Sequence, residues 1–179
     1  PELTPRLTPK ALGELVEMNY KQRAVYVMSA YLEGFTVGEL TSYCDKAYSP
    51  EKFDHPDVAP VHSVDENTHF LELWHGPTAA FKDMALQMLP YFLTASLVKR
   101  SEEKTACILV ATSGDTGKAA LEGFCYVPRT TILVFYPRNG VSAIQALQMV
   151  SQRGDTVGVC SVVGTFDDAQ HGVQAIFSA

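Results

Sequence analysis

The spacing of apolar residues divides the chain into two regions. Up to residue 67, apolar residues recur every three to four positions, which predicts amphipathic helices. From residue 68 onward, short apolar runs alternate with helical patterns, as in βαβ units that build a parallel sheet. The pattern predicts an α/β fold. A helical N-terminal region and connector fill residues 1–67, and a three-layer αβα domain fills residues 68–179.

Helix-start signals precede the apolar patterns of the first region. Thr8 is followed by Pro9, an order typical of an N-cap and the first helical residue. Thr36 and Glu39 have the spacing of a capping box and predict that a helix begins there. The stretch 53–60, "FDHPDVAP", is rich in Pro and Asp and predicts an extended connector.

The apolar runs of the second region predict a short strand and then three covered strands. The short strand is "HFLELW", residues 69–74, and Pro90 is expected to break the helix after it because proline lacks an N–H. The later runs are continuous, as in strands covered on both faces. They are "CILVAT" at 107–112, "TTILVFYP" at 130–137 and "TVGVCSVVG" at 156–164. The last helical pattern has no stop signal, so we expect the domain to be incomplete at its C-terminus.

Charge and composition exclude several classes of protein. The 179-residue chain has a formal net charge of −6, and its longest basic cluster is Lys99–Arg100, which argues against nucleic acid or a membrane surface as a partner. No apolar stretch is long enough to cross a bilayer, and the first ten residues lack a signal-peptide core. The four cysteines form no CxxC pair and predict buried reduced thiols. We therefore expect a cytoplasmic protein without a metal site.

Three turns are rich in small and polar residues: 75–83 "HGPTAAFKD", 112–117 "TSGDTG" and 164–168 "GTFDD". Ligands of parallel sheets bind at the carboxyl ends of strands, so we expect these turns to face one crevice. Gly114 and Gly117 allow a tight turn and a close approach to a ligand, and a helix N-terminus favours a carboxylate or phosphate. A nucleotide P-loop is disfavoured, because the Walker pattern requires glycine five residues before Gly117 and a hydroxyl residue after Lys118.

Lys82 begins an apolar helical pattern that offers little to stabilise a charged amine. Phe81 and Met84 flank it, and desolvation beside a helix N-terminus disfavours the ammonium form. A neutral lysine amine is the nucleophile of Schiff-base chemistry. Asp83 opposes this effect, although its expected role is that of a first-turn helix acid. A solvated surface lysine is the competing interpretation for Lys82. His75, at the end of the short strand, is a weak candidate for contact with a ligand, and the competing interpretation is a hydrogen-bonded structural histidine.

Four segments, in this order, are similar to successive motifs of threonine synthases, which are fold type II (β-family) pyridoxal-phosphate enzymes. The resemblance covers about Phe70 to the C-terminus, and the helical N-terminal region resembles the family less specifically. The segments are "LELWHGPTAAFKDMALQ" at 71–87, "ILVATSGDTGKAALEGF" at 108–124, "VFYPRNGVSAIQALQM" at 134–149 and "VVGTFDDAQ" at 162–170.

The resemblance implies a catalytic Schiff-base lysine at Lys82. It implies that Lys82 and Asp115 bind pyridoxal 5'-phosphate, with Asp115 near the ring oxygen. The implied reaction, that of a carbon–oxygen lyase acting on phosphates, converts O-phospho-L-homoserine and water to L-threonine and phosphate. Residues implied to bind the substrate carboxylate are Thr112, Ser113, Gly114 and Thr116. Signature positions expected to shape the pocket are Ser142, Gln145 and residues 165–168.

Some motifs of the family are absent from these residues. They are its extreme N-terminal motif, the glycine-rich loop for the cofactor phosphate and the partner of the ring nitrogen. The resemblance therefore implies an N-terminal fragment that binds cofactor poorly by itself. Two other functions stay open: a threonine- or serine-dehydratase-like enzyme of the same fold, and a non-catalytic threonine-synthase-like protein that binds a phosphorylated ligand. The sequence does not fix the oligomeric state.

Overall fold

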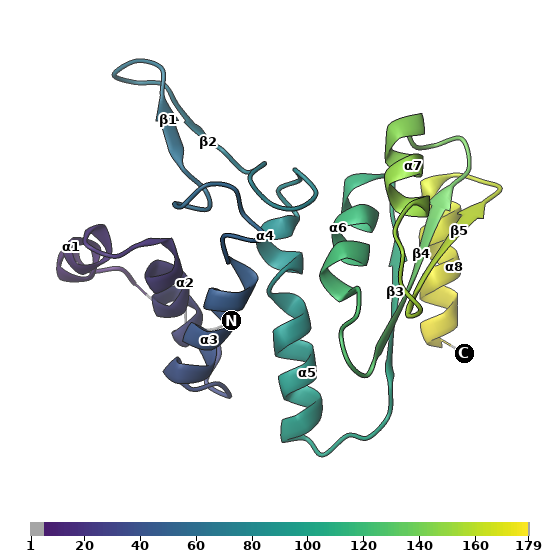
Figure 1. Ribbon diagram of the computed structural model, residues 1–179, viewed down its shortest axis with the longest axis horizontal. Helices are drawn as coiled ribbons and strands as arrows, with labels where there is room; N and C mark the ends of the chain where they lie inside the picture. The colour runs from purple at the N-terminus through teal and green to yellow at the C-terminus, as the bar shows by residue number, and fades with distance from the viewer. Residues whose placement is uncertain (1–5, 179) are drawn as a thin grey trace. The chain divides into compact units, whose positions relative to one another are not determined.

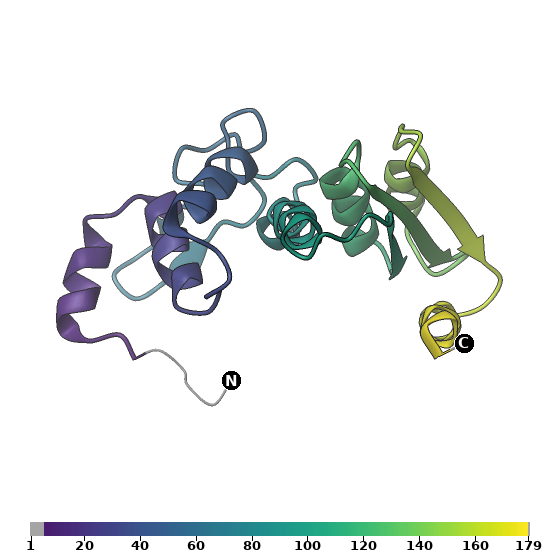
Figure 2. The ribbon, with the colours of Figure 1, turned by 90° about the horizontal axis from the view of Figure 1, so that it is seen from below.

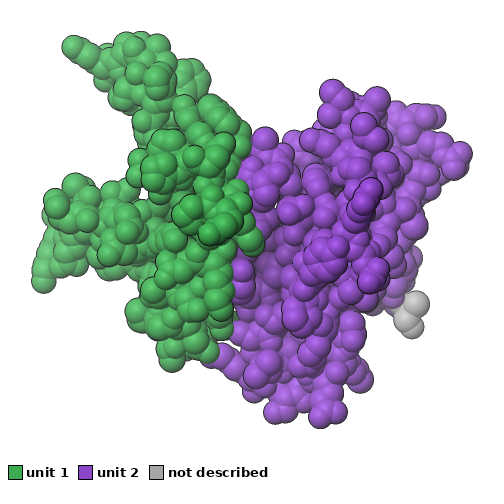
Figure 3. Space-filling view, viewed as in Figure 1, with its two compact units in different colours: residues 1–75 green, residues 76–179 purple. Residues whose placement is uncertain are grey.

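The computed structural model describes residues 6–178, and the chain divides into two compact units, residues 1–75 and 76–179 (Figure 3). The strand β2, His69–Leu71, pairs antiparallel with β1, Val61–Ser63, in a two-stranded hairpin of the first unit. The expectation that residues 69–74 form the first strand of the α/β region is therefore wrong. All six paired residues of this hairpin are exposed, so apolar content alone does not assign the strand to the buried sheet.

Three helices build the rest of the first unit: α1 Pro9–Val16, α2 Tyr20–Ser29 and α3 Val37–Ala47. The N-cap at Thr8 is confirmed, since its hydroxyl accepts the N–H of Ala11 at 3.2 Å. The capping box at Thr36 and Glu39 is confirmed as well. A further capping box at Asn19, not predicted, begins α2.

The core of the first unit gathers around α3. Its inner face buries Leu40, Cys44 and Ala47, and Tyr48 packs its ring edge-on against Phe53, with centroids 5.6 Å apart. Burial raises the pKa of the Cys44 thiol to about 11 and raises the pKa of the Tyr48 phenol as well. These groups are therefore neutral core residues at physiological pH.

A parallel sheet forms the centre of the second unit (Figure 1). Its strands are β3 Ala106–Ala111, β4 Thr130–Pro137 and β5 Val157–Val162, in the order β3-β4-β5. The register places Ile108 beside Ile132, and Val134 beside Val159. The three strands predicted from apolar runs are confirmed, but their complete cover on both faces is not, since each strand contains an exposed residue.

Helices cover both faces of this sheet, as the predicted three-layer arrangement requires (Figure 2). On one face lie α6, Asp115–Phe124, and α7, Ala143–Val150; on the other lies α8, Phe166–Ser178. The main core lies under α6 and α7 and includes Leu121, Phe124, Ile132, Val134 and Met149. Within the described residues, no helix is long and apolar enough to span a membrane.

The face under α8 is less completely covered. Cys107 and Cys160, both on strands, are exposed, whereas Cys44 is buried and Cys125 is half-buried. The expectation that cysteines of the apolar runs are buried is wrong for the two strand cysteines. All four cysteines are free thiols.

The helical pattern after Lys82 forms two helices, α4 Asp83–Leu86 and α5 Leu89–Lys99. The helix is interrupted at residues 87–88. Pro90 lies in the first turn of α5, where its missing N–H costs no hydrogen bond. Close packing joins α4 to α6, since a Cβ atom at Gly123 would collide with the carbonyl oxygen of Leu86. In Figure 1 the N-terminal ends of α4 and α6 lie at the carboxyl end of the sheet strands.

Candidate active site

Lys82 is the N-cap residue of α4 and is half-buried. Its amine nitrogen Nζ lies 4.6 Å from the centre of the Phe81 ring, a distance at which an ammonium group is attracted by the ring face. The Phe81 ring is itself 56% exposed. The apolar enclosure expected around Lys82 is therefore partial in this structure.

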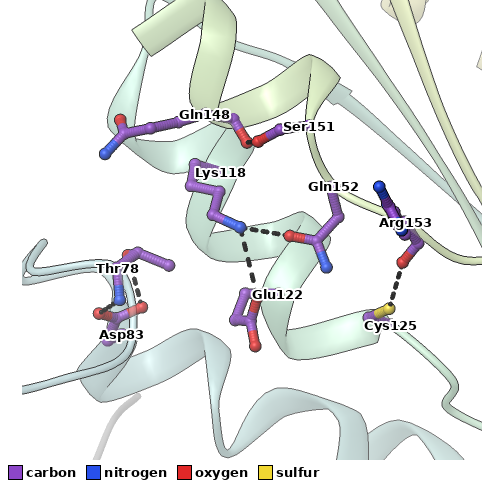
Figure 4. A network of polar contacts seen from close by, with 9 residues as sticks. All are labelled: Thr78, Asp83, Lys118, Glu122, Cys125, Gln148, Ser151, Gln152 and Arg153. Atoms are coloured by element: carbon purple, nitrogen blue, oxygen red, sulfur yellow. Dashed lines mark hydrogen bonds and ion pairs between the residues drawn. The ribbon is translucent and has the colours of Figure 1, made fainter. Parts of the chain in front are cut away.

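The turn that carries Lys82 is built around the neighbouring Asp83. As expected, this residue is an acid in the first turn of a helix, and its carboxylate is in addition fully buried. It accepts the backbone N–H of Thr78 at 2.9 Å and the Thr78 hydroxyl at 2.8 Å (Figure 4). Asp83 thus ties α4 to the segment that leads into it.

The turn at residues 112–117 is organised by the buried hydroxyl of Thr112. Its oxygen accepts the N–H groups of Gly114 and Gly117, each at 3.0 Å, and it donates to the Gly114 carbonyl at 3.2 Å. Gly114 has φ of +150°, a conformation that favours glycine. The Thr112 hydroxyl and the Gly114 N–H are thus already bonded within the turn, and their contact with a substrate stays a prediction.

The glycines of this turn allow close packing within the protein. A Cβ atom at Gly114 would lie 2.6 Å from Cδ of Gln145, and one at Gly117 would lie 2.5 Å from Cγ2 of Thr112 and 2.8 Å from Sδ of Met149. Side chains of the chain itself therefore fill the space beside both glycines. The expectation that these glycines open the backbone to a ligand has no support from this packing.

Other groups of the turn keep free donors. Ser113 and Asp115 are exposed, and Thr116 is half-buried. Within residues 6–178, the backbone N–H groups of these three residues make no hydrogen bond. Unpaired N–H groups at the N-terminus of α6 attract a carboxylate or phosphate. They are the part of the predicted substrate site that is available to a ligand.

Asp115 is held by Gln145, which lies thirty positions later in the chain. The Gln145 side-chain amide donates to Oδ1 of Asp115 at 2.8 Å, and its oxygen accepts the N–H of Ser142 at 3.1 Å. Ser142 and Gln145 form the capping box that begins α7. The capping box therefore also fixes a carboxylate at the start of α6, a contact that helix-cap spacing does not reveal.

The third predicted turn, residues 164–168, is held by hydrogen bonds between its own residues Thr165 and Asp168. Asp168 accepts the N–H of Thr165 at 2.7 Å and the Thr165 hydroxyl at 2.9 Å. These bonds hold the pKa of the Asp168 carboxyl below its usual value. Thr165 in turn accepts the N–H of Asp168 at 3.3 Å, as expected of a helix N-cap.

The amine of Lys118, which follows the glycine turn, bonds to side chains of the protein itself. Its amine donates to the side-chain oxygen of Gln152 and to Oε2 of Glu122, the latter at 3.3 Å (Figure 4). It is therefore neither a solvated lysine nor a free anion ligand. Arg138, a cation that directly follows β4, is exposed.

His75 lies in the first unit and bonds two carboxylates there. Nδ1 lies 2.6 Å from Oδ1 of Asp54, and Nε2 lies 2.8 Å from Oε2 of Glu72. The hydrogen bonds to Glu72 and Asp54 raise the pKa of the imidazole. This bonding supports the interpretation of His75 as a structural histidine. Among the described residues, no three His, Cys, Asp or Glu side chains are placed to hold a metal ion.

No protein-family profile matches the chain, but individual proteins do. It is 38% identical over 179 residues to a threonine synthase of Pseudomonas aeruginosa, covering 99% of the chain and 37% of that protein. It is 34% identical to a threonine synthase-like 2 of Rattus norvegicus, with 99% and 36% covered. The crystal structure of pyridoxal-phosphate-bound threonine synthase from Brucella melitensis superposes with a TM-score of 0.85 at 35% identity, with 97% and 37% covered.

The fold is therefore that of pyridoxal-phosphate enzymes of fold type II. Within that class, the chain is related to threonine synthases along nearly its whole length, which confirms the resemblance carried by the four motifs. The chain spans about 37% of the length of these curated relatives.

Proposed function

We propose that this chain is the lysine-bearing part of a pyridoxal-phosphate-dependent threonine synthase. The reaction of the whole enzyme would convert O-phospho-L-homoserine and water to L-threonine and phosphate. One observation carries the proposal: Lys82 starts a helix packed against α6, whose N-terminal turn keeps free N–H groups at the carboxyl end of the sheet. Proteins with open parallel sheets bind their ligands at the carboxyl ends of the strands.

The residues present fit the cofactor in part. Lys82 supplies a half-buried amine for its aldehyde, and Asp115 supplies an exposed carboxylate whose direction Gln145 fixes. Pyridoxal phosphate, when bound, supplies an electron sink for carbanion chemistry at the substrate. The described glycine turn has no space left beside Gly114 or Gly117, so the fit rests on Lys82 and Asp115.

The chain's own groups would bind the substrate and move its protons. The N–H groups of Ser113, Asp115 and Thr116 would orient the substrate carboxylate, with the Thr112 hydroxyl holding the turn behind them. The amine of Lys82 would then take and return protons at the substrate carbons as a general acid and base. Free N–H groups fixed in this way lower the cost of orienting a charged substrate.

Chemical labelling of Lys82 tests the proposal on the chain as it is. The chain is mixed with pyridoxal phosphate, reduced with borohydride and digested, and the labelled lysines are identified by mass spectrometry. We expect preferential label at Lys82, measured against the exposed Lys10, and its loss in Lys82→Ala. A high cofactor concentration is required, because we expect the isolated chain to bind cofactor weakly and to turn over little substrate. Equal label at Lys82 and Lys10 would contradict the proposal.

The reaction itself requires the longer protein that contains this chain. Release of inorganic phosphate from O-phospho-L-homoserine would identify a threonine synthase. Release of a 2-oxo acid from threonine or serine, without phosphate release, would identify a dehydratase of the same fold. Fractionation of cells that produce the longer protein tests the cytoplasmic location expected from the sequence.

A non-catalytic ligand-binding protein is the second candidate function. We consider it because the chain is 34% identical, over 99% of its length, to a protein described as threonine synthase-like 2 and not as threonine synthase. Such a protein would bind O-phospho-L-homoserine or inorganic phosphate without label at Lys82. Isothermal titration with these ligands, run beside the labelling experiment, separates the two functions.

A further inference from the structure

We propose that Asp83 is a positioning residue for Lys82: its buried carboxylate fixes residues 76–82, and through them the point at which α4 presents the lysine. The inference rests on the proposed function of Lys82. It concerns the one acidic side chain of the described residues that is 0% exposed.

Asp83 is unusual because its carboxyl group is fully buried. A buried carboxylate is costly unless hydrogen bonds replace those it made with water. Both of its observed partners belong to one residue, since Oδ2 accepts the Thr78 N–H at 2.9 Å and Oδ1 accepts the Thr78 hydroxyl at 2.8 Å. Among the described residues no cationic side chain forms an ion pair with it. The segment containing Thr78 is therefore bound to the carboxylate by both oxygens.

The path of the preceding segment is fitted to the same side chain. A Cβ atom at Gly76 would lie 2.6 Å from both Cβ and Oδ2 of Asp83, so only glycine allows this approach. Ala79 has φ of +54°, a conformation costly for a residue with a side chain. Such backbone strain persists where surrounding contacts hold it, and the two bonds from Thr78 to Asp83 are adjacent to it. The carboxylate thus holds a turn that the sequence alone would not favour.

The short helix gives Lys82 little independent support. α4 has four residues and no side-chain bond at its N-cap, which is Lys82 itself. A helix of one turn does not form stably by itself, so its start is set by the segment before it. Because that segment is bound to Asp83, the carboxylate determines the position of the Lys82 backbone.

An ordinary acid in the first turn of a helix is exposed to solvent, whereas Asp83 is buried. Asp167, in the first turn of α8, is exposed and provides a matched control. Four variants are compared with the wild type: Asp83→Asn, Thr78→Val, Thr78→Ser and the control Asp167→Asn. Asparagine keeps the size of Asp83 but replaces one of its two acceptor oxygens by an NH2 donor, so at most one of the two hydrogen bonds that Thr78 donates can be kept. Valine removes the Thr78 hydroxyl, whereas serine keeps it.

The first measurement is the ratio of borohydride-trapped pyridoxal-phosphate label at Lys82 to that at Lys10 in the same digest. Misplacing a reacting group by about 1 Å costs up to about 100-fold in rate, so we expect a fall of about tenfold in Asp83→Asn and Thr78→Val. Thr78→Ser should retain the wild-type ratio, a rescue that general loss of stability would not produce. Asp167→Asn should leave the ratio unchanged. If wild-type Lys82 is labelled in preference to Lys10, a wild-type ratio in both Asp83→Asn and Thr78→Val would overturn the inference.

The second measurement separates this inference from the proposed function. Amide hydrogen exchange is followed in the peptide covering residues 76–82 and in a β4 peptide as a folding control. Faster exchange in the 76–82 peptide of Asp83→Asn, with β4 unchanged, supports the role of Asp83 even if wild-type Lys82 is labelled no better than Lys10. Equal labelling of Lys82 and Lys10 in the wild type would reject the proposed function of Lys82 but not the positioning role of Asp83. Unchanged exchange in Asp83→Asn rejects the positioning role.

Discussion

Replacing Thr112 by valine tests whether one hydroxyl holds the turn at the start of α6. Valine keeps the size of threonine, so the change removes hydrogen bonds without creating a cavity. The N–H of Gly114 loses its observed partner, whereas the N–H of Gly117 keeps a 3.1 Å bond to the Gly114 carbonyl. A buried N–H left without a partner costs about 1–3 kcal/mol, so we expect a loss of about 2 kcal/mol in the free energy of unfolding.

Urea denaturation followed by circular dichroism measures this loss. With a slope of about 1–3 kcal/mol per molar urea, the midpoint should fall by about 1 M. Thr112→Ser keeps the hydroxyl and loses only a methyl group packed beside Gly117, so its loss should be about 1 kcal/mol. The control is Thr105→Val, at an exposed site of the same unit. If Thr112→Val matches this control within about 0.5 kcal/mol, the hydroxyl does not hold the turn and the reasoning fails.

Three further predictions follow from packing and charge. Gly123→Ala should destabilise the second unit by about 1–3 kcal/mol, because the new methyl group meets the backbone of α4. Gly172→Ala should stabilise the unit by up to about 1 kcal/mol, because the new methyl group meets no atom within 4 Å and alanine favours a helix. Thermal unfolding of both variants measures these changes. The raised pKa of His75 predicts stability that is complete below about pH 6.5 and lost as the pH rises through the folded-state pKa. Urea unfolding at pH 5.5 and 8.5 should show this loss in the wild type and less of it in His75→Gln. Gln145→Glu places a second carboxylate against Asp115, so at pH 7 its melting temperature should fall below that of Gln145→Met, and acidification to about pH 4 should narrow the difference.

Local signals were sufficient to predict much of this fold. Hydrogen bonds between a cap and its own helix span three residues, so Thr8 and Thr36 were predicted from spacing alone. Continuous apolar runs identified the parallel strands because covered strands need no polar face. The order of the motifs identified the family, since four specific segments in sequence carry more information than any one of them.

Contacts between distant segments could not be predicted in this way. The pairing of β1 with β2 depends on the hairpin rather than on the composition of residues 69–74. The bond from Gln145 to Asp115 joins two helix starts across thirty positions, although capping already explained Gln145 locally. Asp83 has the position of a common helix acid, and only the fold buries it.

The order β3-β4-β5 gives the parallel sheet two outer strands, each hydrogen-bonded along one side only within the described residues. Unsatisfied backbone groups along such margins recruit further strands, and the exposed thiols of Cys107 and Cys160 lie on the same two strands. We therefore expect concentrated solutions of this polypeptide to form oligomers and, under oxidising conditions, interchain disulfides. Preparations kept dilute, with a reductant present, should remain monodisperse in light scattering for longer than concentrated, unreduced ones.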